Sequence, residues 1–332
     1  MIWLEFLVST VLIVVAARYL ARYGDVISLR TGLGGMFIGT LLMAGATSLP
    51  ELLTAINAIS QDAPSLTVGN IFGSGMFNMF LLALVDLIFY RVHILRRVTI
   101  NHAVSASLAV LIHAVAIFFI IAEVDIAIGW VGVDSLMLIA VYIVGTRILI
   151  GGGDDAETAA EEELEEGTPS LRHALIGFAA AAAMLLLLTP LLVSSSIAIA
   201  EETGLGTGFV GVALVGIVTS LPEVMTTISA ARIGAYDLAI GNLFGSNLFN
   251  VFALGLVDFF FTDGRFLAEV SPAMTIAGML ALIMTTLALL GNLARNLTRG
   301  GTRRLIIDAD ALLIAVIYVL GMILLYNRNL IG

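Results

Sequence analysis

The sequence contains no cysteine and no lysine, and charged residues of all kinds make up only 12% of its 332 positions. The absence of cysteine excludes disulfides, thiolate metal sites and cysteine nucleophiles together. Without lysine, all fifteen basic residues are arginine. A typical cleavage site is also missing after the first apolar segment, so we expect this segment to be retained as a helix.

Most of the sequence is apolar. The chain is 60% hydrophobic with a mean hydropathy of +1.07, well above that of soluble globular proteins. Apolar stretches long enough to cross a bilayer recur along its length, which predicts a polytopic membrane protein. The net charge of −10 says little about partners, because eight acids lie between Asp154 and Glu166 and about −2 remains without them. We expect no nucleic-acid partner and no obligate protein partner.

The apolar pattern predicts an all-α membrane protein with ten transmembrane helices. The arginines give their orientation, since thirteen flank the loops after the odd-numbered spans and only Arg265 and Arg328 lie on the other side. By the positive-inside rule the odd-numbered loops are cytoplasmic and both termini are extracellular, in a cell membrane. The expected spans are 2–22, 32–60, 66–90, 99–122, 126–150, 171–199, 205–232, 237–261, 269–293 and 305–326.

A shift of 172 residues reveals an internal repeat. It places TSLPE 47–51 on TSLPE 219–223, and GNIFGSGMFNMFLLALVD 69–86 on GNLFGSNLFNVFALGLVD 241–258, with twelve of eighteen positions identical. We therefore divide the chain into five-helix repeats at 1–150 and 171–332, joined by an acidic cytoplasmic linker at 151–170. Five crossings are an odd number, so the two repeats have inverted topology, as in secondary transporters with a midplane site.

The first repeated motif places a proline beside a carboxylate in an apolar setting. Pro50 and Pro222 free helix carbonyls, which persist in a membrane only when protein, water or an ion satisfies them. Around the first proline, Thr47, Ser48 and Glu51 have the spacing of one helix face. A simple proline kink explains the proline and the threonine, but a midplane carboxylate costs a few kcal/mol or more unless it is compensated.

The second motif adds hydroxyl and amide groups. Ser74 and Asn78 are four residues apart on one helix face, and Ser246 and Asn250 repeat this spacing. Glycines at 69, 73 and 75, and at 241 and 245, would let helix backbones approach closely. Together the two motifs offer only oxygen ligands, with no His or Cys near them. Such a set is suited to Ca²⁺, or to Na⁺ of similar size, and argues against zinc, copper and magnesium.

TSLPE followed by GNxFGSxxFN, in two copies, resembles the signature repeats of the sodium/calcium exchanger family within the cation/calcium antiporter superfamily. The resemblance implies a Ca²⁺/Na⁺ antiporter that works by alternating access, without a cofactor and without enzymatic activity. It implies that Glu51 and Glu223 are the central calcium ligands. It further implies coordinating roles for Thr47, Ser48, Ser74, Asn78, Thr219, Ser220, Ser246 and Asn250, and for the backbone carbonyls of Ala44 and Gly216.

The chain departs from the family pattern at three points. Many relatives carry an aspartate where this chain has Asn250, and Gly75 stands where the second repeat has Asn247. The linker at 151–170 is too short for the calcium-sensing domain of animal exchangers. Coupling to protons, or exchange of a broader set of divalent cations, stays open as the alternative function.

Other polar residues within the spans have structural interpretations. Asp86 and Asp258 fit helix ends at the membrane boundary better than an ion entrance. His102 and His113 fit polar packing better than a proton relay, and Asp134 has no assigned role. An intramembrane protease using two carboxylates, or a channel, would be a different class of protein; the glutamates in hydroxyl-rich helix breaks favour an antiporter.

Overall fold

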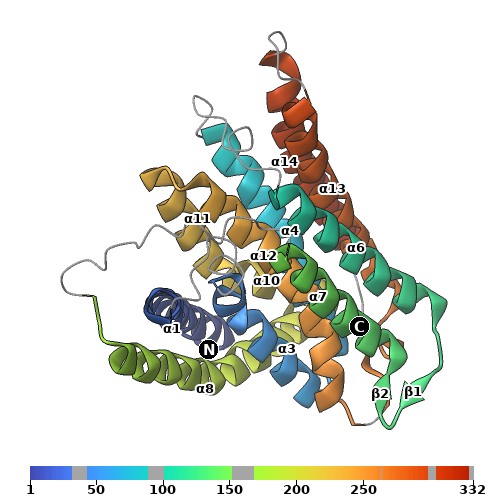
Figure 1. The fold of residues 1–332 in the computed structure, drawn as a ribbon. Coiled ribbons are helices and arrows are strands. Elements are labelled where there is room, and N and C mark those ends of the chain that lie inside the picture. The colour runs from blue at the N-terminus through green and yellow to red at the C-terminus, as the bar shows by residue number, and fades with distance from the viewer. Residues whose placement is uncertain (32–42, 89–100, 152–167, 263, 298–303, 329–332) are drawn as a thin grey trace.

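The computed structural model describes residues 1–31, 43–88, 101–151, 168–262, 264–297 and 304–328, most of which are helical (Figure 1). Its helices and strands are α1 (Ile2–Thr31), α3 (Leu49–Ser60), α4 (Pro64–Ile88), α6 (Asn101–Ala122), β1 (Ala127–Ile128), β2 (Val131–Gly132), α7 (Val133–Gly151), α8 (Leu171–Thr203), α9 (Thr207–Val210), α10 (Gly216–Thr219), α11 (Leu221–Ile233), α12 (Tyr236–Val257), α13 (Thr275–Leu297) and α14 (Arg304–Arg328). A π-helical turn, η2 (Gly211–Val215), joins α9 to α10.

Eight of the described helices are long and apolar enough to cross a bilayer. A ninth candidate is the bent pair 207–219 and 221–233, whose two parts meet at 43°. The expected span 32–60 lies partly outside the described residues, and within them it consists of helical residues 43–47 followed by α3. The molecule is thus a helical membrane protein, while the count of ten and the inverted five-helix repeats stay predictions.

Some helix boundaries differ from the expected ones for local reasons. The helix expected at 126–150 begins only at Val133, because β1 and β2 form a small antiparallel hairpin before it. The helix expected from 269 begins at Thr275, after a 3₁₀ turn that contains Pro272. α1 continues to Thr31 instead of ending near 22, so Arg18, Arg22 and Arg30 are part of this helix.

Two helices form the centre of the molecule and two others lie side by side at its edge. In α4 and α12, 72% of the most apolar window is buried, compared with 28% in α8. α1 packs along α8, and Figure 1 shows this pair beside the remaining helices. The repeated GNxFGS motifs lie on α4 and α12, so the centre of the fold carries the polar residues that an ion site requires.

Glycine lets α4 approach the broken helix closely. A Cβ atom on Gly73 would lie 2.6 Å from Cα of Val212, and one on Gly69 would lie 2.4 Å from the carbonyl oxygen of Gly208. Side chains at these positions would force the two backbones apart. The expected role of Gly69 and Gly73 in close packing is therefore confirmed. The close approach of the two backbones also places Ser74 against α10.

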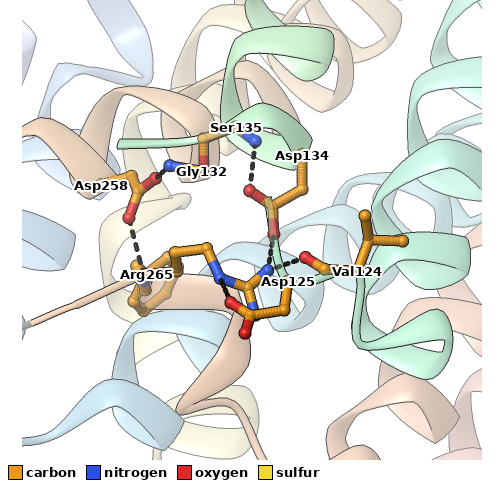
Figure 2. A network of polar contacts seen from close by, with 8 residues as sticks. Val124, Asp125, Gly132, Asp134, Ser135, Asp258 and Arg265 are labelled. Carbon is orange, nitrogen blue, oxygen red and sulfur yellow. Dashed lines mark hydrogen bonds and ion pairs between the residues drawn. The ribbon is translucent and has the colours of Figure 1, made fainter. Parts of the chain in front are cut away.

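Charged residues join the loops at one end of the bundle (Figure 2). Arg265 donates to the carbonyl of Val124 and forms ion pairs with Asp125 (3.3 Å) and Asp134 (3.6 Å). This contact gives the previously unassigned Asp134 a structural role. It joins the segment after α6 to the segment after α12, two segments that the sequence predicts on the same side of the membrane.

Asp258 directly follows α12 and accepts two backbone hydrogen bonds in the same region. Its two carboxylate oxygens each lie 2.7 Å from a backbone nitrogen, one of Gly132 and one of Phe266. At the start of α6, His102 lies 3.2 Å from Asp237 at the start of α12. Both contacts are structural links between helix ends, as the sequence favoured for Asp258 and His102.

Candidate ion-binding site

The repeated TSLPE segments break two helices near the centre of the molecule. Ser48 and Ser220 have nearly the same non-helical backbone, with φ/ψ of −89°/6° and −84°/4°. A new helix begins directly after each serine, so Pro50 and Pro222 stand in its first turn, where the missing amide hydrogen has no helical partner. The sequence predicted a helix break at each proline; the structure places each proline in the first turn of the helix that follows the break.

Each break also places a glutamate in the first turn of the following helix. Glu51 lies in the first turn of α3 and Glu223 in that of α11, and both side chains are fully buried. The positive end of a helix dipole stabilises a carboxylate there, typically by up to about 2 kcal/mol in partly buried positions. This falls short of the several kcal/mol that burial of each ion costs, so further partners are required.

The first of these partners comes from the opposite half of the chain. The hydroxyl of Ser220 donates to Oε1 of Glu51 (3.0 Å), and the hydroxyl of Ser48 donates to Oε1 of Glu223 (3.1 Å). The shift of 172 residues converts one contact into the other. Each glutamate is therefore held by the serine at the helix break of the other TSLPE segment.

Threonine and serine hydroxyls extend the polar centre on both sides. Thr47 Oγ1 lies 3.2 Å from the carbonyl oxygen of Ala44 and 3.5 Å from Ser246 Oγ. Ser246 in turn donates to Oε1 of Glu223 (3.2 Å). In the other half, Ser74 Oγ lies 3.1 Å from the carbonyl oxygen of Gly216 and 3.4 Å from Thr219 Oγ1. The sequence-predicted carbonyls thus lie among the sequence-predicted hydroxyls.

All twelve predicted site residues are buried. Hydrogen bonds connect ten of them to at least one other member of the set. The exceptions are Asn78 and Asn250, which, in the described part of the chain, form no hydrogen bond with another predicted site residue. The structure thus brings the four hydroxyl residues of the helix breaks together with both glutamates, and leaves the two asparagines beside them.

Several oxygen atoms of this centre have no protein partner among the described residues. They are Oε2 of Glu51, Oε2 of Glu223, Oδ1 of Asn78 and Oδ1 of Asn250. A buried acceptor without a donor is destabilising, by about 1–3 kcal/mol and more when it is charged. All four are oxygen ligands of the kind that Ca²⁺ and Na⁺ prefer, so the arrangement fits a cation that binds between the two carboxylates.

Sequence reasoning missed two asparagines that contact the site hydroxyls. Thr219 Oγ1 donates to Oδ1 of Asn70 (3.0 Å), and Thr47 Oγ1 lies 3.3 Å from Oδ1 of Asn242. Asn70 also donates to the backbone carbonyl of Glu51 (3.1 Å). The signal was present, because Asn70 and Asn242 are the second letter of GNxFGS in both copies. Both are buried and polar, and their amide oxygens lie within hydrogen-bond distance of the threonine hydroxyls.

The expectation that no histidine lies near the motifs needs correction. His113 on α6 is fully buried, and its Nε2 atom would lie 3.3 Å from a Cβ atom added to Gly75. Its Nδ1 atom lies 2.7 Å from the carbonyl oxygen of Ala109. One histidine thus contacts α4 next to Ser74. In the described residues, no group of three or more His, Cys, Asp and Glu side chains gathers as a metal site.

Comparisons with known proteins identify the family of the chain. The family described as "Sodium/calcium exchanger protein" matches residues 1–151 and 173–327. Among curated relatives, the sodium/calcium exchanger MaX1 of Methanosarcina acetivorans is 27% identical, over 86% of this chain and 90% of its own.

Solved structures share the fold. The sodium-calcium exchanger NCX_Mj superimposes with a TM-score of 0.61 at 22% identity, covering 97% of this chain and 99% of its own. The H⁺/Ca²⁺ exchanger CAX superimposes with a TM-score of 0.67 at 13% identity, covering 99% of this chain and 90% of its own. At such identities the two structures establish the fold alone.

Proposed function

The chain belongs to the sodium/calcium exchanger protein family, and from this premise we propose that it exchanges Ca²⁺ for Na⁺ across the cell membrane. The exchange is a secondary antiport by alternating access, with one cation site at the midplane between two inverted repeats. Both termini are extracellular, and the acidic linker 151–170 is cytoplasmic. Thirteen of fifteen arginines near the odd-numbered loops support this orientation.

The observation that carries the proposal is the crossed pair of contacts from Ser220 to Glu51 and from Ser48 to Glu223. Each carboxylate keeps one oxygen without a protein partner, and no lysine or arginine is among the site residues. Two buried negative charges are balanced by one Ca²⁺ or by two monovalent cations. The site changes its orientation across the membrane only when it holds one Ca²⁺ or two monovalent cations. This requirement is the condition for antiport.

Neutral oxygens favour sodium as the counter-ion. A proton binds to a single carboxylate oxygen and requires no other ligand. A Na⁺ ion requires a shell of several oxygen ligands. The carbonyls of Ala44 and Gly216, with the hydroxyls of Thr47 and Ser74 beside them, supply such oxygens next to the glutamates. Carbonyl ends of broken helices stabilise cations in secondary transporters. Proton-coupled exchange is the alternative, since CAX, with the same fold, is an H⁺/Ca²⁺ exchanger.

Gradient-driven calcium uptake tests this function. Purified protein in sealed proteoliposomes is loaded with Na⁺ and diluted into Na⁺-free buffer containing radioactive Ca²⁺. We expect internal Ca²⁺ to rise above its external concentration while the Na⁺ gradient lasts, which a channel cannot achieve without a membrane potential, here clamped at zero. A pH gradient at equal Na⁺ should drive no accumulation. Accumulation driven by pH and not by Na⁺ would assign the proton-coupled function.

A further inference from the structure

The two amide ligands of the proposed site have unequal surroundings, although the repeat makes them equivalent. Asn78 donates from Nδ2 to Oδ1 of Asn247, 3.0 Å away, and keeps its own Oδ1 without a partner. Asn250 is equally buried, yet neither Nδ2 nor Oδ1 has a partner among the described residues. The orientation of one amide is thus fixed by the protein and that of the other is not.

Asn247 is itself oriented by two acceptors. Its Nδ2 atom lies 3.3 Å from the carbonyl oxygen of Gly75 and 3.5 Å from Oγ1 of Thr285. Thr285 donates its hydroxyl hydrogen to the carbonyl oxygen of Ala281 (2.7 Å), so its Oγ1 is available to accept. With its amino group directed to these acceptors, Asn247 can present only Oδ1 to Asn78. Asn78 must then meet it with Nδ2, which leaves Oδ1 for a cation.

The same chain of contacts cannot form around Asn250. The shift of 172 residues places Gly75 at the position of Asn247 and His113 at the position of Thr285. Gly75 has no side chain to contact an amide. The ring of His113 takes the adjacent space, with its Nε2 3.3 Å from where a Cβ on Gly75 would lie. His113 nevertheless keeps the backbone contact of its counterpart, since Nδ1 lies 2.7 Å from the carbonyl oxygen of Ala109, the equivalent of Ala281.

We propose that Asn247 is a positioning residue that presents Oδ1 of Asn78 to the cation across the interface of the two halves, and that Asn250 is an amide ligand left free to turn. This inference rests on the proposed function, since it takes both asparagines as ligands. A fixed ligand lowers the cost of binding because its orientation is set before the ion arrives. The ligand that turns adjusts the site to ions of different charge and number.

A set of variants tests whether Asn247 acts through Asn78. Removing the contact with Asn247→Ala should raise the KM for Ca²⁺ about tenfold, the effect of losing one hydrogen bond. In the Asn78→Ala background the same substitution should raise the KM no further, whereas in the Asn250→Ala background it should raise it about tenfold again. Thr285→Val, which removes one acceptor of Asn247 and keeps its volume, should cause a smaller increase that also disappears in Asn78→Ala.

The double variant Gly75→Asn with His113→Thr tests the other half of the inference. It gives the first repeat the equivalents of Asn247 and Thr285, so that Asn250 is oriented as Asn78 is. The KM for Ca²⁺ should therefore fall, and Asn250→Ala should abolish this gain in affinity. His113→Thr alone is the matched control and should give no gain. A KM increase from Asn247→Ala that persists unchanged in Asn78→Ala would overturn the inference. Absence of calcium exchange by the wild-type protein would instead overturn the proposed function.

Discussion

The hydroxyl of Ser48 lies 3.1 Å from the carboxylate of Glu223, 175 residues away in the sequence. Ser220 and Glu51 repeat this relationship in the opposite direction, at 3.0 Å. Neither half of the chain therefore completes a carboxylate site by itself. The crossed contacts also mean that a change at one helix break is transmitted directly to the glutamate of the other.

The crossed contacts predict that Ser48→Ala and Ser220→Ala have similar effects. Each removes a hydrogen bond to a buried carboxylate and a hydroxyl ligand, with a cost of about 1.5–3 kcal/mol. We expect the KM for Ca²⁺ to rise by about tenfold or more in both variants. Calcium dependence of uptake in proteoliposomes measures this change.

Ser60→Ala is the matched control for these serines. Ser60 ends α3, is exposed, and donates only to the carbonyl of Asn57 in its own helix. Its removal should leave the KM unchanged. A strong effect of Ser48→Ala combined with no effect of Ser220→Ala would contradict the equivalence of the two breaks.

The sequence was sufficient for the class of fold and for the residues that the structure gathers in the buried polar centre, because both leave local patterns. Apolar length predicts spanning helices, and TSLPE with GNxFGS marks the breaks and the polar faces. The hydrogen-bond partners of these side chains were not predictable from the sequence. A one-dimensional pattern does not say that Ser48 contacts Glu223 instead of its neighbour Glu51. His113 was missed as a neighbour of the site because its contact with Gly75 joins two helices whose sequences carry no shared signal.

Loop contacts were also beyond sequence reasoning. Arg265 and Asp134 belong to loop-proximal segments that the repeat does not relate, and only the folded chain places them together. The hairpin before α7 contains Trp130 and Val131, residues compatible with a helix or a strand. Its existence depends on tertiary contacts, including the hydrogen bond from the Gly132 amide to Asp258.

Asp258→Asn should lower thermal stability and preserve exchange. The carboxylate accepts from two backbone amides, of Gly132 and Phe266, and an asparagine side chain has one oxygen for the two. One buried amide then loses its acceptor, at a cost of about 1–3 kcal/mol. Asp125→Asn is the control, because this side chain is 93% exposed and its ion pair with Arg265 contributes little. Thermal unfolding in detergent, followed by tryptophan fluorescence, measures the stability of both variants. Loss of calcium exchange in Asp258→Asn would contradict a purely structural role.

Introduced cysteines test the orientation, since the chain contains none of its own. We expect Glu202→Cys to react with a membrane-impermeant maleimide in intact cells, because it is exposed at the end of α8, which corresponds to an even-numbered span. Ala160→Cys in the linker should react only after permeabilisation. Labelling of Ala160→Cys in intact cells would reverse the proposed topology.

The charge of the site predicts an electroneutral cycle of two Na⁺ per Ca²⁺. Asn78 and Asn250 are neutral, so Glu51 and Glu223 are the only carboxylates among the proposed site residues, and unmatched buried charge is costly. Voltage should therefore leave the final calcium ratio unchanged. A potassium diffusion potential imposed with valinomycin during Na⁺-driven Ca²⁺ uptake measures this. A calcium ratio that shifts with an inside-positive potential would indicate three Na⁺ per Ca²⁺.

The central claim is that Glu51 and Glu223 together hold the transported Ca²⁺, and glutamine substitution tests it most directly. Each substitution keeps the shape of the side chain and removes half of the balancing charge. Na⁺-driven Ca²⁺ uptake by Glu51→Gln and by Glu223→Gln should fall to the level of protein-free liposomes. Glu201→Gln, at an exposed position near the end of α8, should match the wild type. Calcium exchange at the wild-type rate in either buried variant would contradict the account.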